Sequence, residues 1–238
     1  MGAHKRHLKR TGMPLAWPTK RKNITFTTRP KPGSHKREYV CPLGVVLRDL
    51  LSYATTTKEA KVILHNEEVL VNGKKCSDVK HPVGLFDIVE IKKTGDKFFL
   101  LFNEEGRFKS IPVEDSYLYL KVSKKLVLGK DKFQLAFMNG FTLSVDAKTF
   151  AETKVADTII YDYTTKKISG TVSLKTGAFV YVFDGKYKGS FGVAKEFTSY
   201  HGLTKDVVLL VVGEHEHTTA KEYCFAIGNS EKDMKRFK

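Results

Sequence analysis

The hydrophobic pattern changes its period twice between residues 42 and 91. Apolar residues recur at intervals of three and four from Leu43 to Leu51, which predicts an amphipathic helix that begins at Pro42. The apolar run Val69–Val71 and the alternation from Asp87 to Ile91 instead predict strands, because successive side chains of a strand point to opposite faces. This stretch is therefore expected to fold as a small α/β unit.

A second helix is predicted to begin at Thr56. Thr56 stands three residues before Glu59, so its hydroxyl is expected to cap the helix while the Glu59 carboxylate reaches back. Ala60, Ile63 and Leu64 then share one apolar face. Four basic residues lie off the apolar faces of the two predicted helices: Arg48, Lys58, Lys61 and His65. Each of them is a candidate for binding, and the alternative for each is a solvated surface charge.

The dipeptide Asn72-Gly73 lies between the apolar run and the basic pair Lys74-Lys75. A two-residue type I′ turn requires positive φ at both central positions, which Asn and Gly tolerate best. We therefore expect a β-hairpin that displays Lys74 and Lys75 on its second strand.

Residues 98–174 carry short apolar runs separated by turn residues such as Asn139-Gly140. Strands at this spacing predict a small barrel or sandwich. The runs predicted to form strands are Phe98–Phe102, Arg107–Ile111, Tyr117–Val122, Leu126–Leu128, Phe133–Met138, Phe141–Val145, Asp157–Tyr163 and Ile168–Leu174.

Glycines bracket an alternating strand between Gly177 and Val193. Val180 and Val182 are predicted to pack inward, and Gly189 to allow a close backbone turn. The tip of this hairpin carries Lys186 and Lys188. Two later runs, Asp206–Val212 and Glu222–Ile227, are expected to complete a barrel.

The first 41 residues carry 11 Lys and Arg and one acid, so they contribute 11 − 1 = +10 of the formal net charge of +15. Few apolar groups and four prolines oppose independent folding, so we expect an extended arm that orders on a partner. Counterion release favours a polyanion, and the rings of Trp17 and Phe26 suit stacking on unpaired bases. The alternative is a solubility tail or nuclear-import signal, which needs neither ring. The candidate RNA-binding residues of the arm are Lys5, Arg6, Lys9, Arg10, Trp17, Lys20, Arg21, Lys22, Arg29, Lys31, Lys36 and Arg37.

Several chemistries lack their sequence signatures. The 3 cysteines form no close pair, and there is neither a phosphate-cradling glycine loop nor a nucleophile elbow. Residues 214–217, Glu-His-Glu-His, have the composition of a metal site, but we favour a polar hairpin turn because no third ligand lies nearby. We therefore expect no catalytic residue, metal, cofactor or small-molecule substrate. No apolar run reaches the roughly 18 residues of a membrane helix, so no membrane partner is expected.

The turn Val71-Asn72-Gly73-Lys74, followed by Asp78 and the strand Asp87–Ile91, resembles the S-four RNA-binding module. Phe86 stands where many members of that family have Gly. The stretch from Gly177 to Val193 is similar to the KOW motif of ribosomal proteins and transcription elongation factors. The two resemblances imply RNA contacts by Arg48, Lys58, Lys61, His65, Lys74, Lys75, Lys186 and Lys188.

The order of these parts resembles the S-four-e family of the eukaryotic and archaeal small ribosomal subunit. Pro32–Lys36, Lys175–Gly177 and Phe225–Gly228 extend the resemblance over nearly the whole chain. It implies a mostly β, α+β fold in five parts. These are an extended basic N-terminal arm (1–41), an S-four-type α/β-hairpin module (42–105), a β-rich central domain (106–174), an SH3-like KOW barrel (175–228) and a short charged tail (229–238).

The resemblance implies a structural constituent of the small ribosomal subunit that binds ribosomal RNA beside neighbouring ribosomal proteins during translation. A cytoplasmic location follows, with nucleolar assembly if the source is eukaryotic. One alternative is an RNA-modifying enzyme, since Leu47-Arg48-Asp49 is similar to the catalytic Arg-Leu-Asp of pseudouridine synthases. We disfavour it because Asp49 falls in a predicted helix and no second large domain is present to hold a flipped uridine. The other alternative is a KOW-type transcription or ribosome-associated factor.

Overall fold

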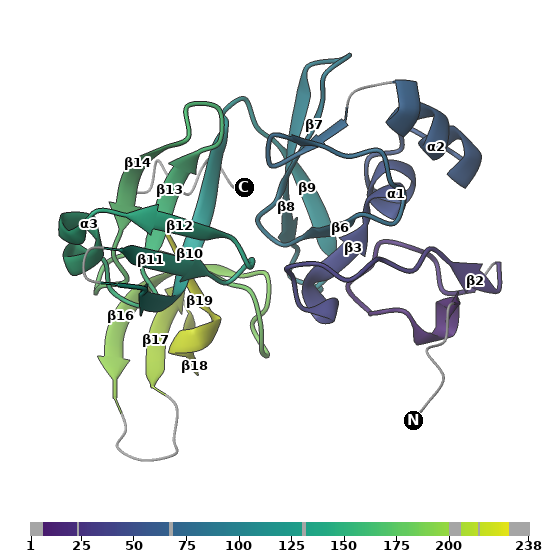
Figure 1. Ribbon diagram of the computed structural model, residues 1–238. Coiled ribbons are helices and arrows are strands. Elements are labelled where there is room, and N and C mark those ends of the chain that lie inside the picture. The colour runs from purple at the N-terminus through teal and green to yellow at the C-terminus, as the bar shows by residue number, and fades with distance from the viewer. Residues whose placement is uncertain are drawn as a thin grey trace, which may run out of the picture. The chain divides into compact units, whose positions relative to one another are not determined.

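The chain is mostly β, with few helices (Figure 1). The computed structural model describes residues 7–22, 24–66, 69–129, 132–199, 206–213 and 215–228. Its contacts divide the chain into two compact units, unit 1 (residues 1–102 and 106–115) and unit 2 (residues 103–105 and 116–238). No helix of the described ranges is long and apolar enough to cross a bilayer. The predicted α+β, mostly β class is confirmed.

Unit 1 contains the basic arm and the α/β segment. Its elements are β1 (Leu8–Lys9), η1 (Arg10–Gly12), β2 (Phe26–Thr27), η2 (Arg37–Tyr39), β3 (Val40–Pro42), α1 (Leu43–Val45), η3 (Val46–Leu50), α2 (Thr57–Asn66), β4 (Val69–Val71), β5 (Lys74–Lys75), β6 (Pro82–Gly84), β7 (Ile88–Ile91), β8 (Asp96–Phe102) and β9 (Phe108–Pro112). A five-stranded sheet has the order β5-β4-β7-β8-β9, and β1-β2 and β3-β6 form separate pairs. The buried residues Val69, Ile91 and Leu100 belong to this sheet.

The first helix differs from its prediction. It begins after Pro42 as expected, but α1 passes at once into η3, a π-helix. The Leu51 N–H donates to the Val46 carbonyl, five residues back, at 2.9 Å, which is the π-helical pattern. The prediction of a helix at this position is confirmed, but the prediction of one regular amphipathic α-helix is wrong.

Helix α2 begins with the predicted capping box. The Glu59 N–H donates to the Thr56 hydroxyl at 3.2 Å, and the Thr56 N–H donates to the Glu59 carboxylate at 3.4 Å. The Thr55 N–H and hydroxyl add two bonds to that carboxylate, each of 2.8 Å. These hydrogen bonds lower the pKa of Glu59 to about 2. The N–H groups of Thr55, Thr56 and Glu59 at the start of the helix therefore have partners.

Thr56→Ala is expected to lower the free energy of unfolding by about 1 kcal/mol, because it removes the hydroxyl that caps α2. Urea unfolding followed by circular dichroism measures the change. Thr56→Ser keeps the hydroxyl and is the matched control. A loss in the serine variant equal to that in the alanine variant would show that the hydroxyl does not stabilise the helix.

The predicted hairpin at Asn72-Gly73 is confirmed. Asn72 has φ +52° and Gly73 has φ +75°, as a type I′ turn requires. The Asn72 side chain also accepts the Ile88 N–H at 2.9 Å. Because this amide reaches from the turn to β7, Asn72 fixes the hairpin on the sheet.

Phe86 adopts the conformation that a glycine would favour. Its φ is +68°, in the left-handed region, while its ring is 4% exposed and lies 6.2 Å from the Phe99 ring. The backbone strain costs about 1–3 kcal/mol, and burying a phenylalanine contributes about 1.5–3 kcal/mol. The packing of the ring therefore offsets the strain at this turn.

Unit 2 contains two five-stranded antiparallel sheets, with the orders β12-β11-β10-β13-β14 and β18-β17-β16-β15-β19. Its elements are β10 (Tyr117–Val127), β11 (Phe133–Phe137), β12 (Thr142–Val145), α3 (Ala147–Glu152), β13 (Thr158–Asp162), β14 (Lys167–Val172), β15 (Phe179–Val182), β16 (Phe191–Thr198), β17 (Val207–Val212), β18 (His215–Ala220), η4 (Lys221–Tyr223) and β19 (Cys224–Gly228).

Two elements of the first sheet differ from the prediction. The sequence predicts two strands, Tyr117–Val122 and Leu126–Leu128, where β10 is a single strand with a register shift between Val122 and Lys124. The bulge lets one strand continue through the polar residues that suggest a break. Helix α3 was not predicted, and the Phe150 ring packs 4.8 Å from that of Phe133.

The segment expected to be a polar turn is instead the strand β18. It pairs with β17 over its whole length, from Ala220 opposite Val207 to His215 opposite Val212. A strand at the edge of a sheet has a solvated face, so polar residues do not prevent it from forming. Within the described residues, no three His, Cys, Asp or Glu side chains are placed to hold a metal ion; Glu214 lies outside them.

A buried lysine joins the two sheets of unit 2. Lys121 of β10 is 7% exposed, and its Nζ donates to the carbonyls of Glu222 and Cys224 at 2.7 and 2.6 Å. Burial disfavours the ammonium and outweighs the nearby acidic groups, so the pKa of Lys121 is lowered to about 8. This side chain satisfies two carbonyls where η4 leads into β19.

Candidate nucleic-acid interface

The basic arm folds against the rest of unit 1. Trp17 is 2% exposed, with its Nε1–H donating to the Val40 carbonyl at 2.7 Å, and the neighbouring Ala16 carbonyl accepts the Phe108 N–H of β9 at 2.8 Å. Leu8, Met13 and Ala16 are buried as well. The expectation that the arm orders only on a partner is therefore wrong. Part of its small apolar set packs inward, while Leu15, Ile24 and Phe26 stay exposed, and composition alone does not reveal which residues do so.

Burial also removes Trp17 from the candidate stacking residues, because its ring presents no accessible face to a base. Phe26 of β2 remains 50% exposed, with its ring 5.5 Å from that of His7. Phe26 is therefore accessible for the stacking contact expected of the arm, and Trp17 is not.

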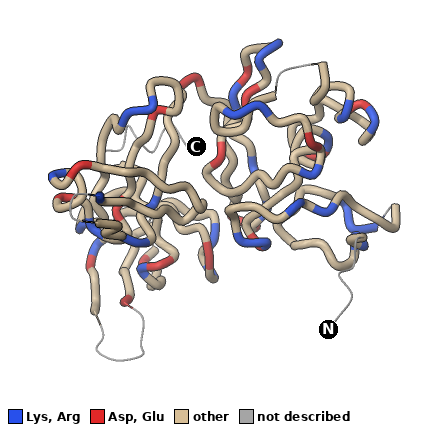
Figure 2. Tube along the Cα trace, viewed as in Figure 1, with Lys and Arg blue, Asp and Glu red and all other residues tan. Residues whose placement is uncertain are grey.

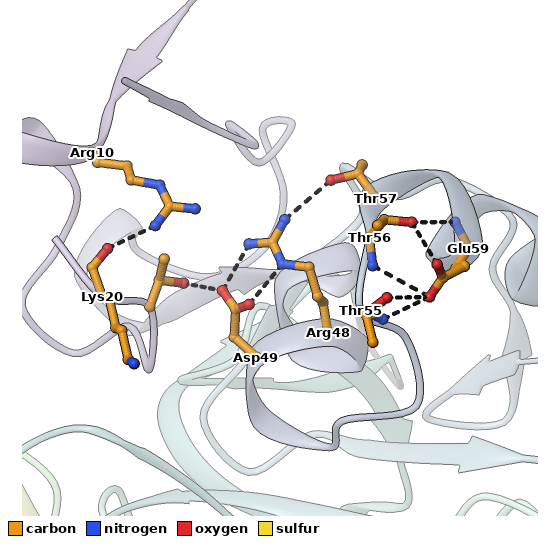
Figure 3. Close-up of polar contacts among 9 residues, drawn as sticks. Arg10, Lys20, Arg48, Asp49, Thr55, Thr56, Thr57 and Glu59 are labelled. Carbon is orange, nitrogen blue, oxygen red and sulfur yellow. Dashed lines mark hydrogen bonds and ion pairs between the residues drawn. The ribbon is translucent and has the colours of Figure 1, made fainter. Parts of the chain in front are cut away.

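Asp49 joins the arm to the helical segment (Figure 3). Its carboxylate accepts two hydrogen bonds from the Arg48 guanidinium, at 2.6 and 2.8 Å, and one from the Thr19 hydroxyl. The same guanidinium donates to the Thr57 hydroxyl at 3.1 Å. Arg48 is therefore engaged inside unit 1 and does not belong to the exposed candidate surface.

Arg10 is a second predicted RNA contact that is buried. Its side chain is enclosed, with 6% of the residue exposed, and Nη1 donates to the Lys20 carbonyl at 2.8 Å (Figure 3). This bond closes a loop within the arm. Arg10 thus stabilises the arm and is not available to a phosphate.

Charge keeps Asp49 ionised. Burial opposes ionisation, but hydrogen bonds from Arg48 and Thr19 and the charges of Arg48 and Arg10 outweigh it, so the pKa of Asp49 is lowered. A carboxylate held this way cannot serve as a catalytic base. Asp49 was predicted to lie on a helix surface; its side chain is 19% exposed, and the rest of it is covered in part by Thr19 of the arm.

Asp87 makes the second junction between the arm and the module. It is 2% exposed, and Oδ2 lies 2.8 Å from His35 Nε2 and accepts the Gly84 N–H at 2.7 Å. Its Oδ1 accepts the Asn72 amide at 2.8 Å. Burial lowers the pKa of His35, but the charge and hydrogen bond of Asp87 outweigh it, so this pKa is raised.

Most of the predicted contacts of unit 1 remain on its surface. Figure 2 shows Lys and Arg recurring along the arm and on α2. Arg29 is half-buried, whereas Lys5 and Arg6 lie outside the described residues. The exposed members of the set are Lys9, Lys20, Arg21, Lys22, Lys31, Lys36, Arg37, Lys58, Lys61, His65, Lys74 and Lys75.

In unit 2 the predicted contacts lie on the loop between β15 and β16. Lys186 is exposed, with its Nζ 5.4 Å from the centre of the Tyr187 ring, while Lys188 is half-buried. The Tyr187 ring stacks on His217 of β18, with centroids 4.0 Å apart. A cation and a stacked ring pair therefore occur together at this loop.

Pattern reasoning assigned no role to the residues that hold the arm in place. Thr19 and Asp49 are 30 positions apart, and His35 and Asp87 are 52 apart. No periodicity spans such distances. The available signals are the family-like stretch Pro32–Lys36, which contains His35, and the S-four-like strand Asp87–Ile91, which contains Asp87.

Comparison with known proteins gives two family matches. Ribosomal family S4e matches residues 94–168, and the RS4NT (NUC023) domain matches residues 1–38. The structure is similar to the crystal structure of the 30S ribosomal protein S4e from Thermoplasma acidophilum. The TM-score is 0.68 at 26% identity, covering 81% of this chain and 97% of that one.

Two relatives are similar over nearly their whole length. The small ribosomal subunit protein eS4 of Methanocella arvoryzae is 35% identical over 225 residues, covering 93% of this chain and 94% of that protein. The eS4 protein of Methanocaldococcus jannaschii is 34% identical over 238 residues, covering 97% of each. All these matches fall in one class, the structural proteins of the small ribosomal subunit. Within that class, the chain belongs to the S4e family.

Family membership decides between the functions left open by the sequence. The S4e family consists of structural ribosomal proteins and not of enzymes. The prediction of a non-enzymatic ribosomal protein is confirmed, and the RNA-modifying enzyme is not favoured. The pairing of Asp49 with Arg48 agrees with this result.

Proposed function

We propose that this chain binds ribosomal RNA as a structural constituent of the small subunit, mainly through a basic face of unit 1. The observation that carries the proposal is the set of exposed cations on the arm, on α2 and on β5. Cations spread over a folded surface suit phosphates at fixed positions better than the edges of particular bases. Recognition should therefore follow the shape of the RNA.

The module assignments belong to the same proposal. We assign α2 and the β4–β5 hairpin to an S-four-type module, and β15–β19 to a KOW-type unit. The type I′ turn at Asn72-Gly73 supports the first assignment. Positive φ at Gly185 and Gly189, which flank Lys186, supports the second. The five-part division of the chain follows from these assignments.

Partners and location follow from the same function. Ribosomal RNA and neighbouring proteins of the small subunit are the proposed partners. Mature subunits would place the chain in the cytoplasm, with nucleolar assembly if the source is eukaryotic.

Replacing Lys58, Lys61 and Lys74 by glutamine is expected to flatten the salt dependence of RNA binding. Each phosphate contact contributes about 0.7–0.9 to the slope of log K against log salt, so three lost contacts reduce it by about 2 to 3. Filter binding to small-subunit ribosomal RNA over a salt series measures the slope.

The matched control replaces Lys166, Lys167 and Lys175, three exposed lysines of unit 2, by glutamine. It removes the same charge from a surface that is not part of the proposed face. An equal flattening in both variants would mean that binding follows net charge and not this face of unit 1.

A further inference from the structure

A hollow of about 540 Å³ lies in unit 1 between the arm and β6. Its volume falls within the range of small-molecule sites, roughly 300–1,000 Å³. Four prolines contribute to its walls: Pro14, Pro30, Pro32 and Pro82. We call this feature the arm hollow.

Only basic residues supply charge to the arm hollow. Arg29, Lys31, Arg37 and Lys80 line it, and no Asp or Glu does so. Lys31 is paired with Asp78 at 2.5 Å, which neutralises it. Within the described residues, the side chains of Arg29 and Arg37 make no hydrogen bond or ion pair. Two guanidinium groups are therefore available to an anion.

The walls of the hollow are fixed before any ligand arrives. The Lys31 N–H donates to the Lys80 carbonyl at 2.9 Å, and His35, which lines the hollow, is held by its pair with Asp87 at 2.8 Å. Gly33 packs so closely on Pro82 that an added Cβ would lie 2.4 Å from the ring. A preformed site loses less conformational entropy on binding than a flexible one.

The combination of proline walls and unpaired guanidinium groups points to a flat ligand with an anionic end. Unpaired RNA bases pack against apolar rings and guanidinium planes, and phosphates accept charge-assisted hydrogen bonds from arginine. A base-paired nucleotide is excluded, because its ring faces are covered within the duplex. An acidic peptide would satisfy the cations but would leave the flat walls without a matching surface.

We propose that the arm hollow binds one unpaired nucleotide of the ribosomal RNA, with its phosphate on Arg29 and Arg37 and its base between the prolines. This inference rests on the proposed function. It gives the arm a pocket for one extruded nucleotide, in addition to a surface that follows phosphates.

Trp17 provides a direct readout, because it lines the hollow and is the only tryptophan of the chain. The full chain is titrated with each of the four nucleoside monophosphates, with inorganic phosphate, and with RNA hairpins that have or lack one bulged nucleotide. We expect saturable quenching of Trp17 fluorescence by the monophosphates and by the bulged hairpin. The bulged hairpin should bind more tightly than the paired one.

The double variant Arg29→Gln/Arg37→Gln is expected to weaken mononucleotide binding by about 10-fold or more, since hydrogen bonds to charged groups are lost. Arg29→Lys/Arg37→Lys retains the charge without the planar fork and should bind with intermediate strength. Lys166→Gln/Lys167→Gln is the matched control and should bind as the wild type does. Circular dichroism establishes that each variant is folded.

Three results would overturn the arm hollow as an RNA nucleotide site. They are an absence of saturable quenching, binding of inorganic phosphate as tight as that of the monophosphates, and equal binding of the two hairpins. Filter binding to ribosomal RNA is measured in parallel. If that binding is normal while quenching is absent, only the nucleotide site fails; if the wild type does not bind ribosomal RNA, the proposed function fails.

Discussion

Gly189→Ala is expected to lower the free energy of unfolding of unit 2 by about 2–6 kcal/mol. A Cβ at Gly189 would lie 2.0 Å from the Asn103 carbonyl oxygen, and the residue has φ +88°. Left-handed backbone at a non-glycine residue costs about 1–3 kcal/mol, and overpacking against fixed atoms adds about 1–3 kcal/mol. Thermal unfolding followed by circular dichroism measures the loss.

Gly177→Ala is the matched control. Gly177 has nearly the same backbone conformation, φ +84°, but a Cβ there would meet nothing within 4 Å. Only the conformational cost of about 1–3 kcal/mol applies, so this variant should unfold at a higher temperature than Gly189→Ala. Equal melting temperatures would contradict the close packing of Gly189 on Asn103.

Asp87→Ala is expected to destabilise unit 1 by about 3–5 kcal/mol, because it breaks a buried charged pair and leaves polar groups without partners. His35, the Gly84 N–H and the Asn72 amide all bond to this one carboxylate. Urea unfolding measures the effect. The arm and the hairpin should both lose order, since Asp87 joins them.

Asp78→Ala is the control for this effect. Asp78 also pairs with a basic residue of the arm, Lys31, at 2.5 Å, but the two side chains are 40% and 62% exposed. Exposed ion pairs contribute about 0–1 kcal/mol. If Asp78→Ala lowers the free energy of unfolding as much as Asp87→Ala does, burial of the Asp87 network does not explain its contribution to stability.

The His35–Asp87 pair also predicts a pH dependence. The pKa of His35 in the folded chain is raised above its ordinary value of 6.5, so the folded state binds the proton more tightly than the unfolded state. The resulting stabilisation is complete below pH 6.5 and is lost as the pH rises through the folded-state pKa. Denaturation of the wild type and His35→Gln across this range tests it, and equal pH dependence in both would contradict the pairing.

Local features of the fold were predictable from the sequence. The Asn72-Gly73 turn and the Thr56–Glu59 capping box each depend on residues within a few positions of one another. Backbone preferences and short-range hydrogen bonds act at this scale. Both features therefore follow from residue types alone.

The placement of the arm was not predictable in this way. Its average composition is basic and polar, yet Trp17 is buried and the neighbouring Ala16 carbonyl accepts the Phe108 N–H of β9. A single contact with a strand far along the chain leaves no periodic signal. The strand β18 was not predicted for a related reason, because its polar residues lie at a sheet edge.

The candidate interface was predicted by residue type and corrected by geometry. Lys58 and Lys61 are exposed as expected, because α2 turns its apolar face to the core. Arg48 has the same charge but is captured by the adjacent Asp49. Sequence shows which residues are cationic, and the structure shows which of them already have partners.

The central claim is that this chain is a structural constituent of the small ribosomal subunit. The most direct test sediments an extract of the source cells through a sucrose gradient, with and without magnesium chelation, and quantifies the chain. We predict one copy per small subunit, retained in high salt and moving wholly to the small-subunit peak on chelation. Substoichiometric binding that is lost at moderate salt would contradict the claim and would favour a ribosome-associated factor.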